Sequence, residues 1–550
     1  MSLKSKITFS QFIEKHLNII FVILTLLTGF FIVLPFANFQ AYLAQGDHGR
    51  DLYGYWIVYQ GGLPYRDFTH LFGPLMPEYY ALMFKLFGVK IQSVLLGQNI
   101  LIVLNGFLVY QICRQFGTNF FAYTFSLMYW GFRDIEFFYT YNHTGGLTAI
   151  LLLVYALIRY LNSYEIRYLY VGFFSSTLLM LIRLNMGIAF WFGFGFCVLL
   201  IHGINQKPIT RTVIKHLLRS AIIFVIPVIF IYWQLLHDLP DYVLRQSFPW
   251  GSNQRSDATS SPLQALFLLR QWLLFFFTQS KLYIFEGWLI ILGLLYTAQL
   301  TLTKKFNNPE GRKLLTQLVI LAALITIGLH EYLTSGVHYR VEWVGPICYV
   351  FLASLLASIL QKGHKIFNLK IIQTFILFGI ILFSYLKFSG YYEVITKSKT
   401  PGQYLNWNGT KIFTTQDPSW FNTVYSTLNF IDRNIPANEP ILCAPYDALY
   451  LFLTQHKSPS REVMIFKHFR ISPEQDQAIA DNLEKKHVNW VILSNRAISS
   501  DPGLGILGKD YCPKLESYLE KNFKIAAKIG PWNGEDSWAW NHGTRILKRK

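Results

Sequence analysis

The chain has 550 residues, of which 52% are hydrophobic, 17% aromatic and only 15% charged. A soluble protein of this length would carry about a quarter charged residues, so the composition excludes a soluble globular fold for most of the chain. The formal net charge of +18 does not indicate nucleic-acid binding, because many basic residues flank apolar runs and no nucleic-acid-binding motif is present.

The apolar residues come in runs of about twenty, long enough to cross a hydrocarbon core about 30 Å thick. The run from His16 to Phe39 is too long for the core of a signal peptide and lacks an A-x-A-like cleavage site, so we expect an uncleaved first span. Residues 262–279 are also apolar, but Arg270 at their centre predicts a helix lying along the membrane surface. The runs predict a polytopic α-helical membrane protein with about eleven transmembrane helices, at residues 17–39, 93–113, 116–132, 143–162, 168–182, 185–205, 217–236, 281–300, 314–330, 341–361 and 370–388.

Lysines and arginines in short loops favour the cytoplasmic side of a membrane. With the N-terminus inside, the cytoplasmic connections receive nearly every basic cluster, for example residues 207–215 and 304–313. Two loops, 40–92 and 237–280, and everything after about residue 389 then face outward. We expect a multi-pass protein of a bacterial inner (plasma) membrane, surrounded by membrane lipids.

The last part of the chain changes character. Residues 439–446 and 488–494 are strand-like, and residues 473–486 have a helical pattern, which predicts a C-terminal extracytoplasmic α/β domain. The expected organisation is a transmembrane catalytic domain at 1–389, with outer loops 40–92 and 237–280, followed by the α/β domain at 390–550. Of the five cysteines, only Cys443 and Cys512 share this soluble region, where they could form one disulfide.

The first outer loop holds several charged residues close to the membrane surface, among them Asp47, Arg50 and Asp51. A carboxylate in a water-poor cleft can act as a general base when a substrate hydroxyl reaches it. The alternative is that these charges are solvated or bind lipid headgroups. Charge alone does not decide between the two readings.

Two stretches of this loop form a recognisable pattern. Asp47-His48-Gly49 with Tyr53, and Gly61-Gly62-x-Pro64-Tyr65-Arg66-Asp67-Phe68 followed by Gly73-Pro74-Leu75, resemble the first outer loop of C-type membrane glycosyltransferases. The most similar members are the bacterial protein-mannosyltransferase-like and aminoarabinose-transferase-like group. These enzymes take a sugar from a polyprenyl-phosphate carrier. Their catalytic base is an acidic residue just after the first span, which Asp47 matches.

The resemblance implies further residues. The family frequently has Asp-Glu where this chain has Asp47-His48, so His48 either assists catalysis or only occupies the place. A second acidic residue is expected after the third span, where Asp134 is the better candidate and Glu136 the weaker one. The alternative is that Arg133 and Asp134 form a contact that anchors the end of the span.

Arg183-Leu184-Asn185-Met186-Gly187 resembles a basic-polar element at the outer end of a span. Pieces at 444–453 and 483–492 resemble the extracytoplasmic domain of bacterial members.

Departure of a carrier phosphate develops negative charge, which requires fixed cations, and the arginine fork suits phosphate oxygens. Candidates at outer span ends are Arg133, Arg183 and Arg340, with the last two favoured, although each could be a snorkelling anchor. We also expect His48, Tyr65, Arg66 and His338 to contact substrate. His330, Glu331 and His338 match no metal-site signature, so no metal site is predicted and a divalent cation is left open.

The sequence therefore predicts a glycosyltransferase that moves a sugar from a polyprenyl-phosphate donor to an acceptor hydroxyl by single displacement, with Asp47 as base. The acceptor could be a lipid, a polysaccharide or a protein. One alternative is a surface-polysaccharide polymerase or ligase. A transporter fits less well, because its charges would lie within the spans and its halves would match.

Overall fold

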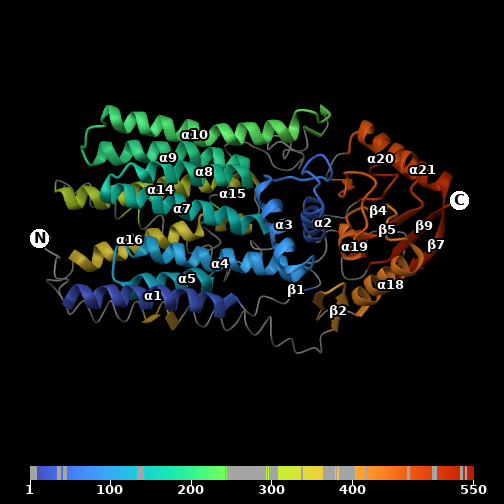
Figure 1. Cartoon of the computed structure of the whole chain (residues 1–550), viewed down its shortest axis with the longest axis horizontal. Helices are drawn as coiled ribbons and strands as arrows, with labels where there is room; N and C mark the ends of the chain where they lie inside the picture. The colour runs from blue at the N-terminus through green and yellow to red at the C-terminus, as the bar shows by residue number, and fades with distance from the viewer. Residues whose placement is uncertain are drawn as a thin grey trace, which may run out of the picture.

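The computed structural model describes residues 9–33, 39–40, 46–132, 141–241, 308–335, 338–362, 403–414, 418–467, 471–497, 505–532, 537–538 and 542–550, with a few isolated residues between 243 and 382. A bundle of long helices forms one end of the molecule, and a mixed sheet with helices forms the other (Figure 1). Helix α1, the first described element, begins at the end of the bundle farthest from the sheet, and the C-terminus lies at the outer edge of the sheet.

The bundle confirms a mostly helical, membrane-spanning protein. Six helices are long and apolar enough to cross a membrane by length and composition. The count of eleven stays a prediction, because the expected spans at 281–300 and 370–388 and the surface helix at 262–279 fall almost wholly outside the described residues. The bundle helices are α1 (Phe9–Val33), α4 (Ile91–Cys113), α5 (Asn119–Phe132), α7 (Tyr141–Ser163), α8 (Arg167–Ile182), α9 (Leu184–Ile204), α10 (Arg211–Leu236), α14 (Pro309–Gly328) and α16 (Gly345–Lys362).

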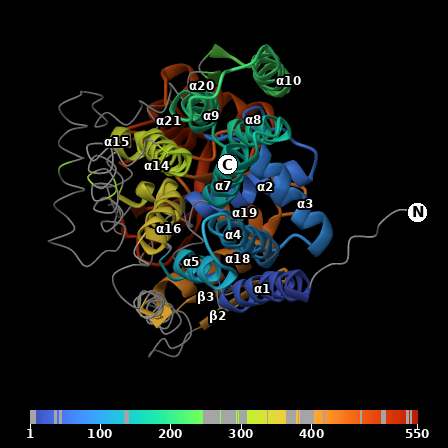
Figure 2. The same ribbon diagram turned by 90° about the vertical axis from the view of Figure 1, so that its left-hand side faces the viewer.

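Helix α7 is the central helix of the bundle. Seen along the bundle, it is surrounded by α4, α8, α9, α14 and α16 (Figure 2). Its apolar residues, such as Ile150, Leu153 and Leu157, are fully buried. Residues at the start of α7 therefore lie in the middle of the protein rather than at the rim of the bundle.

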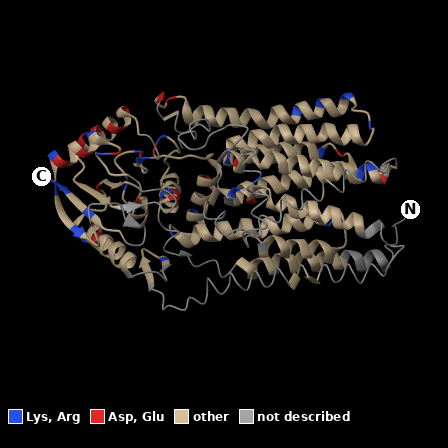
Figure 3. Ribbon diagram, turned by 180° about the vertical axis from the view of Figure 1, so that it is seen from behind, with Lys and Arg blue, Asp and Glu red and all other residues tan. Residues whose placement is uncertain are grey.

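Helices α1 and α10 lie on opposite sides of the bundle, and both expose many apolar side chains. Their apolar side chains, for example Phe31 on α1 and Ile229 on α10, are 65% and 63% exposed, which is expected of a surface that contacts hydrocarbon. Basic residues collect at the end of the bundle that carries the N-terminus (Figure 3).

The first outer loop is more ordered than its charged sequence predicts. It forms α2 (Asp47–Tyr59) and α3 (Leu75–Phe87), which pack against each other. Helix α2 is buried along almost its whole length. The apolar residues of Leu52-Tyr53-x-Tyr55-Trp56-Ile57-Val58 supply the reason, because they need partners that only distant parts of the chain provide.

The C-terminal part contains a four-stranded mixed sheet of order β4-β5-β9-β7. β4 and β5 are parallel, and the other neighbouring pairs are antiparallel. Strands lie at both predicted places, β4 and β5, and a helix at the third, α20. The elements are β2 (Gln403–Trp407), β3 (Thr410–Thr414), α18 (Pro418–Asn434), β4 (Ile441–Ala444), α19 (Ala448–Thr454), α20 (Pro473–Lys485), β5 (Trp490–Ser494), β6 (Arg496–Ala497), α21 (Pro513–Asn522), β7 (Phe523–Ile529), β8 (Ser537–Trp538) and β9 (Thr544–Arg549).

The outer loop and the C-terminal part share one hydrophobic core. Trp56 of α2, Phe84 of α3 and Phe452 of α19 belong to the same buried cluster, in which the rings of Phe84 and Phe452 stack with centroids 5.8 Å apart. In addition, β1 (Phe39–Gln40), which follows α1, pairs in parallel with β3. The sheet part is thus packed directly on the loop that carries Asp47.

Cys443 and Cys512 are both free and buried. The disulfide that the sequence allows is not formed.

Candidate functional site

Asp47 is the first residue of α2 and lies where the outer loop meets the C-terminal part. The preceding Gly46 has φ of 60°, a left-handed conformation that glycine adopts without steric cost. At the start of a helix the backbone N–H groups stabilise a carboxylate. The Asp47 side chain is 60% exposed, so a substrate can reach it.

Two groups from opposite parts of the molecule hold Asp47. Arg50 Nη1 donates to Asp47 Oδ1 at 2.7 Å, and the hydroxyl of Tyr446, which follows β4, donates to the same oxygen. Arg50 Nη1 also lies 3.2 Å from the Tyr446 hydroxyl. The carboxylate is therefore fixed in orientation while the side chain stays exposed, as a general base requires.

Arg50 joins Asp47 to a second, buried carboxylate. Its Nε and Nη2 atoms donate to Asp51 Oδ1 at 2.8 and 2.7 Å, and both side chains are only 4% exposed. Burial raises the pKa of Asp51 to about 6, and the Arg50 guanidinium opposes the rise. Asp51 thus changes charge near pH 6, and Arg50 links it to Asp47.

His48 faces inward. It is 6% exposed, and its ring packs edge-on against Tyr141 at 4.9 Å between centroids. Burial lowers its pKa to about 3, so the imidazole is neutral at physiological pH. This placement gives His48 a packing position beside Asp47.

Tyr65 and Arg66 have partners other than Asp47. Tyr65 is 1% exposed, and its hydroxyl donates to the backbone oxygen of Phe72. Arg66 is 55% exposed and forms a surface ion pair with Asp67 at 2.7 Å. Tyr65 therefore shapes the loop that carries Phe72, and Arg66 lies on its surface.

Gly73 fixes the same loop against the outer end of α8. Its N–H donates to the Ile182 oxygen at 2.8 Å, and a Cβ at this position would lie 2.1 Å from the Leu181 oxygen. Only glycine permits this approach. The contact brings Phe72 next to Arg183, the residue after α8.

Phe72 lies between two guanidinium groups. The Cζ of Arg50 is 5.8 Å from the centre of its ring, and the Cζ of Arg183 is 5.4 Å from it. Cations at this distance are attracted by the ring's quadrupole. One aromatic ring thus lies between Arg50, the partner of Asp47, and a second polar cluster.

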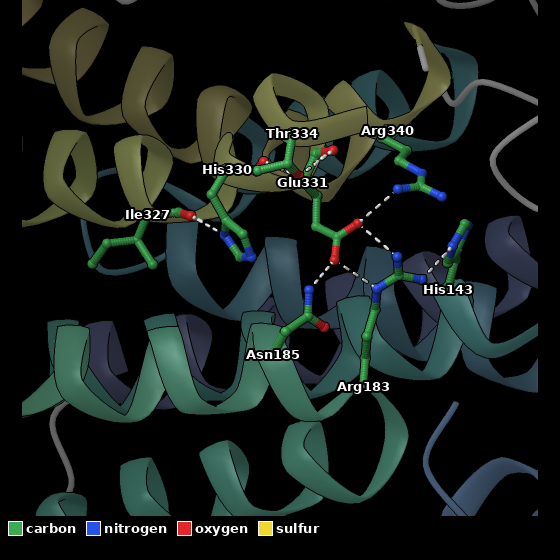
Figure 4. A network of polar contacts seen from close by, with 8 residues as sticks. All are labelled: His143, Arg183, Asn185, Ile327, His330, Glu331, Thr334 and Arg340. Carbon is green, nitrogen blue, oxygen red and sulfur yellow. Dashed lines mark hydrogen bonds and ion pairs between the residues drawn. The ribbon is translucent and has the colours of Figure 1, made fainter. Parts of the chain in front are cut away.

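That second cluster is centred on Glu331, in the short helix α15 (His330–Ser335) (Figure 4). Arg183 binds it bidentately, Nε to Oε1 at 2.9 Å and Nη2 to Oε2 at 2.6 Å. Arg340, in the 3₁₀ helix η4 (His338–Trp343), binds Oε2 at 3.2 Å. Asn185 Nδ2 donates to Oε1. One carboxylate is thus shared by two guanidinium groups.

The two predicted phosphate-binding arginines differ in exposure. The Arg183 side chain is 10% exposed, and its third contact is to His143 Nε2, 3.4 Å from Nη1. The Arg340 side chain is 23% exposed. A ligand would reach Arg340 more readily, and Arg183 holds the cluster together.

Four residues that the sequence analysis singled out lie outside what the structure describes. Arg133 and Asp134, with the weaker alternative Glu136, lie outside the described residues, and so does the side chain of His338. Within the described part of the chain, no group of three or more His, Cys, Asp or Glu side chains is placed to hold a metal ion.

Sequence reasoning missed the partners of the predicted residues. Tyr446 is 399 positions from Asp47, and no local pattern links the two. Glu331 carried a signal, since an acidic residue at the end of an apolar run is costly unless paired. The sequence analysis weighed Glu331 only as a possible metal ligand, whereas in the structure it forms ion pairs with Arg183 and Arg340.

Residues 73–233 match the dolichyl-phosphate-mannose-protein mannosyltransferase family. ArnT from Cupriavidus metallidurans bound to undecaprenyl phosphate has a similar fold, with a TM-score of 0.53, 9% identity and coverage of 96% of this chain and 98% of that chain. Its apo state gives a TM-score of 0.53, 10% identity and coverage of 97% and 98%. No curated protein matches the chain in sequence.

The archaeal oligosaccharyltransferase AglB from Archaeoglobus fulgidus, in complex with an inhibitory peptide and a dolichol-phosphate, matches at a TM-score of 0.48 with 12% identity. The match covers 86% of this chain and 69% of that chain. The family match and the ArnT-like fold confirm the resemblance to the C-type membrane glycosyltransferases. The family match begins at Gly73, so it does not include Asp47.

Proposed function

We propose that this protein is a C-type membrane glycosyltransferase that transfers a sugar from a polyprenyl-phosphate donor to an acceptor hydroxyl at the outer face of a bacterial plasma membrane. The observation that carries the proposal is Asp47, exposed, fixed by Arg50 and Tyr446, and separated by one ring from the Arg183–Glu331–Arg340 cluster. Undecaprenyl phosphate bound to the similarly folded ArnT supports a carrier of this class.

In the proposed reaction Asp47 accepts the proton of the acceptor hydroxyl, and the resulting oxygen nucleophile attacks the anomeric carbon. The bond between that carbon and the phosphate oxygen breaks, and the electron pair leaves with the polyprenyl phosphate. A single displacement inverts the anomeric configuration. The base is oriented before the substrate arrives, which lowers the entropic part of the barrier.

The leaving phosphate gains negative charge as its bond to the sugar breaks. Arg340 is the proposed phosphate contact because it is the more exposed arginine of the cluster. Arg183 positions Glu331, and through it Arg340. Arg133 and Asp134 stay as proposals for the same outer face.

The C-terminal part has a proposed role in both acceptor binding and base orientation. Tyr446 from this part contacts Asp47 directly. Backbone contacts add to this, since Arg461 O accepts from the Thr69 N–H at 2.7 Å and Arg461 Nε donates to Tyr65 O at 2.7 Å. We propose that residues 390–550 form an outward-facing domain whose docking completes the site built by residues 1–389.

The test is sugar transfer by purified wild-type protein and Asp47→Asn in liposomes, with a panel of labelled polyprenyl-phosphate sugars and an envelope extract as acceptor. We expect at least a hundredfold loss in Asp47→Asn, because the amide cannot accept the proton. The matched control is Asp238→Asn, since Asp238 is 84% exposed beyond the end of α10. Equal transfer by the wild type and Asp47→Asn would remove Asp47 from the mechanism. Product size separates single-sugar transfer from joining of preassembled oligosaccharides.

A further inference from the structure

The outer end of the central helix α7 contains a buried amide without a partner. Asn142, the second residue of α7, is 3% exposed, and neither its Nδ2 nor its Oδ1 atom has a hydrogen-bond partner among the described residues. Leaving an amide buried and unpaired costs free energy of about 1–3 kcal/mol. Such a group calls for an explanation by a ligand or by ordered water.

The direction of Asn142 follows from helix geometry. Residues three and four positions along a helix share a face, so Asn142 lies above Gly145 and Gly146. A Cβ at Gly145 would meet Met76 and Ile182, and one at Gly146 would meet Trp343. Asn142 therefore lies on the face of α7 that meets Ile182, the last residue of α8 before Arg183, and Trp343 of η4.

The neighbours of Asn142 belong to the proposed site. His143 contacts Arg183, with 3.4 Å between His143 Nε2 and Arg183 Nη1, and Figure 4 shows it pointing at the Arg183–Glu331 pair. The Arg183 guanidinium also lies over the Trp343 ring at 5.5 Å. On the other side, the Tyr141 ring contacts His48, which is adjacent to Asp47. The start of α7 thus lies between the base and the arginine cluster.

We propose that Asn142 binds hydroxyl groups of the sugar carried by the donor, an inference that rests on the proposed function. A carboxamide has donors on Nδ2 and an acceptor on Oδ1. Phosphate oxygens without a proton only accept, so a phosphate would leave Oδ1 unpaired. Two neighbouring sugar hydroxyls satisfy both atoms, because a hydroxyl donates and accepts.

The burial of Asn142 also excludes that this residue is a glycosylation site. Asn142-His143-Thr144 matches the glycosylation acceptor pattern, but a side chain that is 3% exposed cannot carry a glycan. The amide is placed to recognise a sugar and not to be modified by one.

The substitution Asn142→Leu tests the proposal, because leucine has a similar volume and no polar atoms. Removal of an unpaired buried amide should leave thermal stability in detergent unchanged or higher. Loss of two hydrogen bonds to the sugar should weaken binding of the glycosylated donor about tenfold. Binding of the bare carrier should not change.

The measurement compares dissociation constants for undecaprenyl phosphate and for undecaprenyl-phosphate sugars (mannose, glucose, N-acetylglucosamine and arabinose) with full-length wild type and Asn142→Leu. The comparison between the two proteins uses the glycosylated lipid whose sugar the wild type transfers. Asn162→Leu is the matched control, because Asn162 lies at the opposite end of α7. If Asn142→Leu does not purify, Asn142→Ala replaces it.

A tenfold loss confined to the glycosylated lipid supports the proposal. Unchanged affinity for both lipids means that the amide binds water only, and it overturns the proposal. Equal loss for both lipids overturns it as well, since the contact would then be to the carrier. If the wild type transfers none of these sugars, the proposed function itself fails, and the sugar subsite fails with it.

Discussion

At the scale of single residues, the proposed base depends on a hydroxyl from the other end of the chain. Tyr446 is 4% exposed, and its ring packs on Phe466 with 5.0 Å between centroids, so its hydroxyl is held in place. A hydrogen bond to an ionised carboxylate contributes about 1.5–3 kcal/mol. Tyr446 is therefore a positioning residue for Asp47.

We expect Tyr446→Phe to lower kcat at least tenfold and to leave the KM for the donor near that of the wild type. The acid limb of the pH–kcat profile should move to higher pH, because the ionised carboxylate of Asp47 loses a donor. Tyr518→Phe is the control, since the Tyr518 hydroxyl also donates to a carboxylate, Glu484, far along the tail. An unshifted pH profile in Tyr446→Phe would exclude the positioning role.

Asp51 gives the site a predicted pH dependence. Its pKa of about 6 means that raising the pH through 6 ionises it, and Arg50 is then shared between two carboxylates. The Arg50 guanidinium then stabilises the Asp47 carboxylate less, and Asp47 becomes a stronger base. His48 and His70 do not contribute near pH 6, because burial lowers the pKa of each to about 3.

We expect kcat/KM of the wild type to rise severalfold with a midpoint near pH 6, and Asp51→Asn to lack this step. The folded protein favours protonated Asp51, so the contribution of this residue to the free energy of unfolding falls as the pH rises from the ordinary aspartate range through 6. Thermal unfolding between pH 4.5 and 7 checks the sign. A step near pH 6 that persists in Asp51→Asn would assign it to another group.

Only part of the candidate site could be predicted from the sequence, because several of its contacts join residues far apart in the chain. Asp47 could be predicted because its position after the first span and the loop motif are local features. Its orientation could not, because one of the two groups that hold it, Tyr446, is 399 positions away, although the other, Arg50, is only three residues from Asp47. Arg183 was predicted as a phosphate ligand, but its pairing with Glu331 spans two helices and leaves no periodic signal.

At the scale of elements, the apolar runs predicted the described bundle helices because a span must satisfy its own backbone hydrogen bonds in the membrane. Between α1 and α4 the prediction was less complete, since the sequence indicated a charged outer loop where α2 and α3 form. Helix α2 buries Tyr53 and Trp56 against the C-terminal part, and the Tyr53 hydroxyl accepts from the Ser458 N–H at 2.8 Å. The helix depends on these distant partners.

At the scale of elements, Gly73 also forms the contact between the first loop and the end of α8. A methyl group there would overlap the Leu181 oxygen, and such overpacking costs about 1–3 kcal/mol. We expect Gly73→Ala to lower the Tm and to reduce transfer at least tenfold, because Phe72 and Arg183 would separate. Gly195→Ala on α9 is the control, since a Cβ there meets nothing within 4 Å. Wild-type transfer by Gly73→Ala would show that the loop tolerates the displacement.

At the scale of the whole molecule, the proposed mechanism requires the sheet part and Asp47 to face outward and the basic helix ends to face the cytoplasm. The charge distribution supports this orientation, because the end of the bundle farthest from the sheet carries basic residues (Figure 3) and short basic loops favour the cytoplasm. The contact between Asp47 and Tyr446 puts the base on the same side as the sheet.

Two variants, each with one added cysteine in place of a lysine, test this orientation. Lys207→Cys lies in the loop between α9 and α10, and Lys524→Cys lies on β7, and both positions are exposed. The five native cysteines are all buried, so their background labelling should be low. A membrane-impermeant maleimide applied to intact spheroplasts should label Lys524→Cys and leave Lys207→Cys unlabelled until the cells are lysed. The reverse pattern would place Asp47 in the cytoplasm, where a donor presented at the outer leaflet could not reach it.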